Sequence, residues 1–175
     1  NQLIKIGVVD TMNATAKDSL LRQLRGEGQI RLNILLRSID QVVTDEINIP
    51  YEDRQTDFEE KLKVFAHISR GKFQPEIMSS FNVEFVDTPK DSLKQSFVWN
   101  GKKYEQQFDN YADAISGNEW LNLANFINEA LNDRKLPERF LCLSGTNKPY
   151  CFNFIFVTPE QKAALQMMDS SLFGE

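Results

Sequence analysis

The chain has one histidine, and its neighbours do not suggest catalysis. His67 lies between Phe65 and Ile68 in a segment with helical spacing. No serine or cysteine nucleophile sits in a recognisable elbow that a histidine base could serve. A structural or surface histidine is therefore the better interpretation of His67.

Carboxylates are the other residues that could do acid–base chemistry. Asp109 with Asp113, and Glu59 with Glu60, form two pairs of the residue types that glycosidases use. Spacing in sequence does not establish the separation of two carboxylates, and a solvated charged surface explains both pairs more simply. No glycine-rich turn or Gly-Lys-Ser/Thr sequence is present to hold a phosphate, so we predict no catalytic residues and no cofactor.

The two cysteines lie nine residues apart in a predicted hairpin. Folding the strands about a loop at residues 145–148 places Cys142 opposite Cys151. A disulfide there would indicate an oxidising compartment, whereas two free thiols would behave as small apolar side chains. We favour free thiols, which slightly favours the cytoplasm over the periplasm or secretion and leaves the compartment open. Two cysteines and one distant histidine are too few ligands for zinc, so we expect no metal.

Composition limits the classes of partner. The formal charge of −5 and the pI near 5.0 disfavour a nucleic-acid binder, which needs a basic face. They suit a basic protein partner, but mild acidity is also the default for soluble proteins and is the simpler interpretation of the charge. No apolar run approaches the roughly 20 residues of a spanning helix, so we expect no membrane span. The chain begins at Asn1, as a piece of a longer protein or a mature chain without its signal peptide would.

The first part of the chain has mostly helical periodicity. Residues 3–9 are a strand candidate, and residues 16–25 a short helix. An apolar stripe from residue 30 to 47 predicts a core-facing helix, and a second predicted helix over residues 58–68 ends near Gly71, placed for a left-handed cap. The two stripes consist of Leu32, Leu35, Leu36, Ile39, Val42, Val43 and Ile47, and of Phe58, Leu62, Phe65 and Ile68.

From residue 80 the apolar period changes to two, which predicts strands. The first alternation comes from Phe81, Val83 and Phe85. A hairpin follows over residues 93–108, in which Asn100-Gly101 supplies the positive φ values of a type I′ turn. This register pairs Phe97 with Tyr104 and Leu93 with Phe108.

The last third combines a helix, the cysteine hairpin and a final helix. Asn118 is the predicted N-cap of a helix whose apolar side comprises Trp120, Leu123, Ala124, Ile127, Ala130 and Leu131. The apolar strand over residues 150–157 is predicted to be central. Thr158, Pro159 and Gln161 form a capping-box pattern that starts the final helix, with Leu165 and Met168 as its expected core contacts.

These elements predict an α+β fold. N-terminal helices, over about residues 15–72, precede a β-β-β-α-β-β-α order over about residues 80–170 with a mostly antiparallel five-stranded sheet. A chain of 175 residues with 41% hydrophobic content is long enough for one good core, so we predict a single domain covering residues 1–175.

Aromatic and acidic residues around the hairpin and the following helix are the candidates for partner binding. Some of these aromatics can exceed what the core holds, and Trp and Tyr commonly anchor interfaces. Filling the space between sheet and helix is the simpler alternative. The candidate partner-binding residues are Tyr104, Asp109, Tyr111, Asp113, Glu119 and Trp120.

The C-terminal half resembles small bacterial immunity proteins, the cognate inhibitors of contact-dependent and other polymorphic toxins. The resemblance rests on the order FVWNGKKY at residues 97–104, a Trp-Leu helix reaching Leu131, a strand opening at Arg139-Phe140, and FIFVTPEQ at residues 154–161. It covers roughly residues 95–168. It implies stoichiometric occlusion of a toxin domain by acidic and aromatic surface residues that meet a basic cleft, with no catalytic residues.

The sequence therefore predicts a non-catalytic binding protein of the immunity class, with a protein partner such as a basic toxin domain. Two alternatives remain. One is a small secreted or periplasmic enzyme that uses a carboxylate pair, which would require a cleft lined by carboxylates of raised pKa. The other is an accessory domain of a larger protein.

Overall fold

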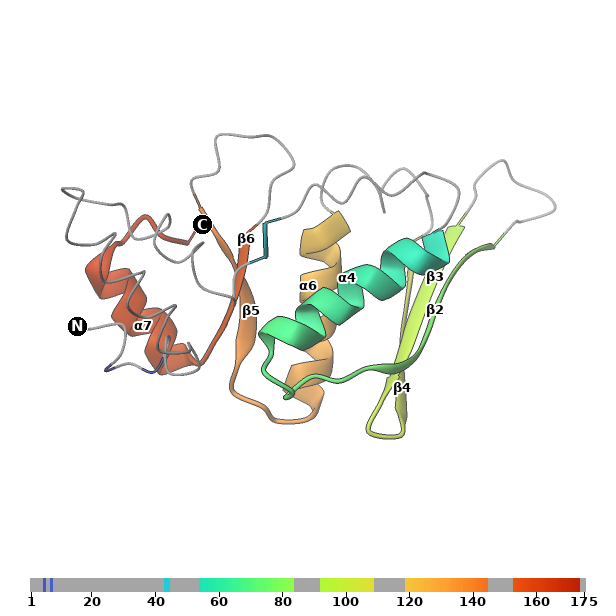
Figure 1. Cartoon of the computed structure of the whole chain (residues 1–175), viewed down its shortest axis with the longest axis horizontal. Helices are drawn as coiled ribbons and strands as arrows, with labels where there is room; N and C mark the ends of the chain where they lie inside the picture. Colours follow the sequence, from blue (N-terminus) through green and yellow to red (C-terminus); the bar gives the residue numbers. More distant parts are fainter. Residues whose placement is uncertain are drawn as a thin grey trace, which may run out of the picture. The chain divides into compact units, whose positions relative to one another are not determined.

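The computed structural model describes residues 54–83, 92–108, 119–144 and 153–173, together with Val43, Thr44, Lys5 and Gly7. Its helices and strands confirm the α+β class with antiparallel sheets, and the order from β2 onward is the predicted β-β-β-α-β-β-α (Figure 1). The elements are β1 (Val43–Thr44), α4 (Arg54–Ile68), β2 (Glu76–Val83), β3 (Ser92–Trp99), β4 (Lys102–Phe108), α6 (Glu119–Asp133), β5 (Arg139–Leu143), β6 (Asn153–Val157) and α7 (Pro159–Met168).

The chain divides into two compact units, residues 46–135 and residues 1–45 with 136–175. The first unit contains α4, α6 and an antiparallel sheet with the strand order β2-β3-β4. The second contains α7 and an antiparallel sheet with the order β1-β6-β5. The single domain of the sequence analysis stays a prediction.

The β3–β4 hairpin has the predicted turn and register. Asn100 and Gly101 have φ values of 48° and 73°, as a type I′ turn requires. Phe97 pairs with Tyr104 and Leu93 with Phe108, which confirms the predicted register. Asn and Gly tolerate positive φ with little strain, so the turn fixes which residues of the two strands lie opposite each other.

Helix α4 forms where the apolar stripe predicts it. The four stripe residues are all at most 2% exposed. After the helix, Arg70 and Gly71 have φ values of 57° and 79°, so the chain leaves α4 through a left-handed turn at the predicted glycine. The stripe residues are Phe58, Leu62, Phe65 and Ile68.

Aromatic rings join the helices to the sheet in the first unit. Phe97 of β3 lies 5.3 Å from Phe73 and 5.0 Å from Phe126 of α6, measured between ring centroids. Phe65 of α4 lies 5.7 Å from Trp120 of α6. The predicted apolar side of α6 is confirmed, since its buried residues include Leu123, Ala124, Ile127, Ala130 and Leu131.

In the second unit, β6 is the central strand, as predicted, and all five of its residues are buried. Thr158 caps α7 with the full capping box: its hydroxyl accepts from the Gln161 N–H, and the Gln161 side chain accepts from the Thr158 N–H. Leu165 is fully buried, as predicted. Met168 is 39% exposed, so its predicted core role was wrong, because it lies in the last turn of α7 beside the still more exposed Met167.

The single five-stranded sheet is not confirmed, because the described strands form two sheets. Strand β6 pairs with β5 on one side and with β1 on the other, which leaves it no free edge for the β2-β3-β4 sheet. Val43, predicted to lie on a helical stripe, instead lies in β1 opposite Phe154. Pairing with the buried strand β6 outweighs the local helical periodicity at this position. Lys5 is helical, so the strand predicted over residues 3–9 is wrong at this position, because a short apolar run can also begin a helix. The other elements predicted before residue 54, and Phe85, lie outside the described residues.

Candidate functional site

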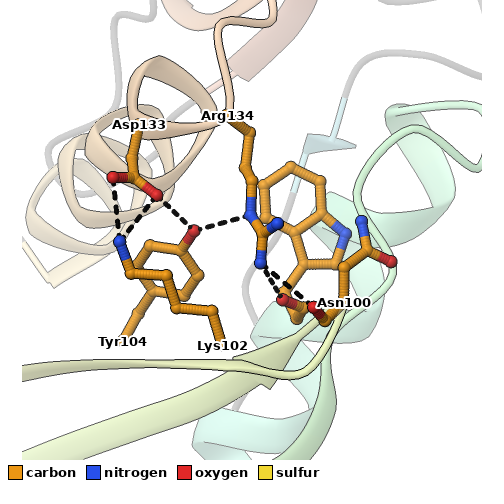
Figure 2. Close-up of polar contacts among 6 residues, drawn as sticks. Asn100, Lys102, Tyr104, Asp133 and Arg134 are labelled. Carbon is orange, nitrogen blue, oxygen red and sulfur yellow. Dashed lines mark hydrogen bonds and ion pairs between the residues drawn. The ribbon is translucent and has the colours of Figure 1, made fainter.

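The end of the β3–β4 hairpin is held against the last turn of α6 by a network of charged and polar side chains (Figure 2). We call this network the hairpin clamp. Its members come from the end of β3, the turn, the start of β4 and the end of α6, so both the hairpin and the helix must form before it can assemble. The hairpin clamp consists of Trp99, Asn100, Lys102, Tyr104, Asp133 and Arg134.

Tyr104 is fixed from two sides. Its hydroxyl donates to Asp133 Oδ2 at 2.8 Å and accepts from Arg134 Nε at 3.0 Å. Its ring is stacked on Phe97 at 5.4 Å. Lys102 Nζ also bonds both Asp133 carboxylate oxygens at 2.8 Å, and it lies 5.2 Å from the Tyr104 ring centroid. The position of the Tyr104 side chain is therefore set by contacts within the chain itself.

Arg134 connects the helix to the turn. Its Nη2 donates to the backbone oxygens of Trp99 at 2.9 Å and Asn100 at 3.1 Å. Its guanidinium carbon lies 5.9 Å from the Trp99 ring centroid, within the range of a cation–π contact. The planar fork of five donors lets one arginine bind two carbonyls and a phenol at once.

The charges of the hairpin clamp shift two pKa values. Hydrogen bonds from Lys102 and Tyr104 lower the pKa of Asp133 below its usual 3.8. Burial, followed by the hydrogen bond to Asp133, raises the pKa of Tyr104 above 10.0. Both groups thus keep their ordinary charge at neutral pH. With two cations and one carboxylate, this surface is mixed in charge.

A second polar cluster lies between α4 and the start of α6. Lys61 is only 5% exposed, and its Nζ lies 2.5 Å from Asp57 Oδ2 and 2.8 Å from Glu119 Oε2. It also lies 5.6 Å from the Trp120 ring centroid. Burial raises the pKa of Glu119 above 4.5, against the attraction of Lys61. These contacts hold α4 to α6, which gives Glu119 and Trp120 a packing role.

The three predicted partner-binding residues that the structure describes do not lie together. Tyr104 contacts Asp133 at the end of α6, whereas Glu119 and Trp120 begin that helix. The 15 residues of α6 rise in fourteen steps of 1.5 Å, so its two ends are about 21 Å apart. Asp109, Tyr111 and Asp113 lie outside the described residues.

Cys142 has a free, partly buried thiol, and burial raises its pKa. It lies opposite Phe154 in the β5–β6 ladder, so the predicted pairing with position 151 was wrong by three residues. The physical reason is a longer connection, since β5 ends at Leu143 and β6 begins only at Asn153. Cys151 itself lies outside the described residues.

The carboxylates of Glu59 and Glu60, the described pair considered for acid–base chemistry, both have structural partners. Glu59 accepts a hydrogen bond from Gln55, and Glu60 binds Lys63 at 2.7 Å, so these two carboxylates face different partners on α4. Within the described ranges, no three side chains of metal-ligand type come together around a possible ion. The helices described here include none long and apolar enough to cross a bilayer.

Sequence reasoning missed the groups that make the two clusters. Asp133, Arg134 and Lys61 were not singled out, because ordinary charged residues on a helix give no signal of their long-range partners. A basic residue directly after the last turn of α6 was the one available hint for Arg134.

No protein-family model, no curated protein and no solved structure matches this chain.

Proposed function

We propose that this chain is a non-catalytic binding protein that presents the hairpin clamp to a protein partner. The observation that carries the proposal is the fixed position of the Tyr104 hydroxyl between Asp133 and Arg134. Ordering a side chain at an interface costs roughly 0.5–1.5 kcal/mol, and a surface that is already ordered avoids most of that cost.

The hairpin clamp also has the residue types that dominate binding energy. Tyr104 offers a rigid ring, Arg134 a partly buried guanidinium and Lys102 an exposed ammonium. Tyr, Trp and Arg are the residues most enriched among those that contribute most to interfaces. This composition supports a binding surface more than a reaction centre, which would need an acid, a base or a nucleophile beside a cleft.

Within this class, we propose the immunity function: stoichiometric occlusion of a cognate bacterial toxin. Its supports are the sequence resemblance and the net charge of −5, which favours encounter with a basic domain. In such a complex Tyr104 would act as the aromatic anchor, and the net negative charge of the chain would speed association more than it strengthens the final contacts.

The test begins with the chain as bait in a lysate of the source cell, washed at high salt, followed by mass spectrometry. The retained domain is then expressed in a sensitive host with and without the chain. The proposal expects one toxin-like domain, growth arrest by that domain alone, and rescue by the chain. A domain that does not arrest growth, or the absence of any retained toxin domain, would overturn the immunity function.

Variants then test the surface. Tyr104→Ala should weaken capture at least tenfold, because truncation of an anchoring residue costs 2 kcal/mol or more. Lys63→Ala, on the exposed side of α4, is the control and should bind as the wild type does. Circular dichroism of Tyr104→Ala checks that a loss of binding is not a loss of folding, and Tyr104→Phe keeps the ring while removing the hydroxyl that Asp133 and Arg134 hold. Equal capture by all three variants would exclude the hairpin clamp as the binding surface.

A further inference from the structure

The two edges of the β2-β3-β4 sheet differ in how their backbone groups are satisfied. At the β2 edge, Gln55 of α4 acts as a substitute for a neighbouring strand. Its Nε2 donates to the Met78 carbonyl oxygen at 2.8 Å, and its Oε1 accepts from the Ser80 N–H at 2.7 Å. Groups two residues apart on one strand are those that an antiparallel neighbour would bind. Gln55 therefore closes the middle of this edge.

The β4 edge is open within the described residues, since the sheet ends at this strand. The two-residue turn makes Trp99 and Lys102 the hydrogen-bonded pair next to the loop, and such pairs alternate along a hairpin. The backbone groups of Lys103, Glu105 and Gln107 consequently point away from β3. The side chains of these three residues are exposed as well.

We propose that two copies of this chain associate through their β4 edges, as antiparallel strands centred on Tyr104. In this register Lys103 of each copy lies opposite Glu105 of the other. Strands bind each other only through residues whose backbone groups point outward, which restricts the possible registers. The neighbouring registers place Lys103 opposite Lys103 or Glu105 opposite Glu105, and like charges directly opposite each other are unfavourable.

Charges already gather at this edge in the single chain. Glu105 binds Lys103 at 2.8 Å and Lys94 at 2.7 Å, and these lysines lower its pKa. A second copy would extend this row of alternating charge across the two-fold axis. Lysines on an edge strand normally oppose strand addition, and here the partner's Glu105 supplies the opposite charge. Pairing uses backbone groups of β4 and leaves the Tyr104 hydroxyl with Asp133 and Arg134.

Two charge-reversal variants and their mixture test the register. Lys103→Glu gives a strand with two acidic positions, and Glu105→Lys gives a strand with two basic ones. In the proposed register each variant places like charges opposite each other twice in its own dimer, whereas the mixture restores opposite charges at both places. Sedimentation equilibrium of the purified chain over a concentration series measures the dissociation constants, and circular dichroism checks that each variant is folded.

The proposal expects a wild-type dimer, at least roughly tenfold weaker self-association of each variant, and a one-to-one mixture that forms a heterodimer about as tight as the wild type. A wild type that is monomeric at millimolar concentration would overturn it. So would variants that dimerise as tightly as the wild type, or a mixture that stays monomeric. Because no toxin is present, this result is independent of the capture test for the immunity function.

Discussion

Arg134 lies over the indole ring of Trp99 and also donates a hydrogen bond to the backbone oxygen of the same residue, at 2.9 Å. One side chain at the end of α6 thus holds both the ring and the backbone at the end of β3. Thirty-five positions separate the two residues, so this relationship depends on the packing of α6 on the sheet.

Replacement of Arg134 should loosen the hairpin end. Arg134→Ala should lower the free energy of unfolding in urea by about 2 kcal/mol, because it removes charge-assisted hydrogen bonds to two carbonyls and a phenol. Arg134→Lys should restore less than half of this loss, since an ammonium cannot reproduce the fork. Lys135→Ala, at the exposed neighbouring position, is the control. Full restoration by lysine would show that charge alone matters at this position.

Gln55 should stabilise the β2 edge. Gln55→Ala leaves the Met78 carbonyl and the Ser80 N–H without their side-chain partner, which should cost about 1–3 kcal/mol and speed hydrogen exchange at Ser80. Gln55→Glu keeps an acceptor for Ser80 but places a carboxylate beside the Met78 oxygen and Glu59. It should therefore be no more stable than the alanine variant at neutral pH. Lys63→Ala on the same helix should change stability by less than about 0.5 kcal/mol.

The two ends of α6 should show opposite pH dependence. Burial raises the pKa of Glu119, so the folded chain binds this proton more tightly than the unfolded chain does. Its contribution to the free energy of unfolding therefore falls as the pH rises from the unfolded value, near 4.5, through the raised folded value. The pKa of Asp133 is lowered in the folded chain. Its contribution to the free energy of unfolding is therefore present above the unfolded pKa of 3.8 and is lost as the pH falls through the lower pKa of the folded chain.

The opposite pH dependence of Glu119 and Asp133 can be measured by urea unfolding between pH 3 and pH 8, with the neutral variants Glu119→Gln and Asp133→Asn for comparison. The stability of the wild type relative to Glu119→Gln should decrease with rising pH, whereas relative to Asp133→Asn it should increase. Equal signs for the two differences would contradict the assigned directions.

Asn153 should limit the stability of the second unit. It is fully buried in β6, and its side-chain nitrogen and oxygen have no hydrogen-bond partner among the described residues. Burial of an amide without partners costs about 1–3 kcal/mol in proteins. Asn153→Leu, similar in volume, should raise the free energy of unfolding by about that amount. Asn153→Asp should lower the free energy of unfolding by more than any neutral substitution at this position, because it buries a charge. A less stable leucine variant would contradict the assignment of an unsatisfied amide.

Much of the local structure in both units could be predicted from local signals. The Asn100-Gly101 turn sets the pairing of Phe97 with Tyr104, and the stripe from Phe58 to Ile68 defines the buried side of α4. Thr158 and Gln161 complete their capping box within four residues. In each case the interacting groups are close in sequence, so residue types and spacing alone specify the contacts.

The partners of distant groups could not be predicted in the same way. Periodicity identifies strands without naming their neighbours, and for this reason the two sheets were predicted as one. The strand register predicted at Cys142 was wrong because the register depends on the length of the connection between β5 and β6.

The sequence by itself determined the Asn100-Gly101 turn, the left-handed exit of α4 at Gly71, the N-cap of α7, the buried faces of α4 and α6 and the order of the described elements from β2 onward, because these depend on local geometry and periodicity. The predicted N-cap Asn118 lies outside the described residues. Only the tertiary structure decided that Arg134 binds the end of β3, that Gln55 closes β2 and that Lys61 of α4 binds Glu119 of α6. Each of these contacts joins residues that only packing brings together, and burial sets their strength by removing the groups from water.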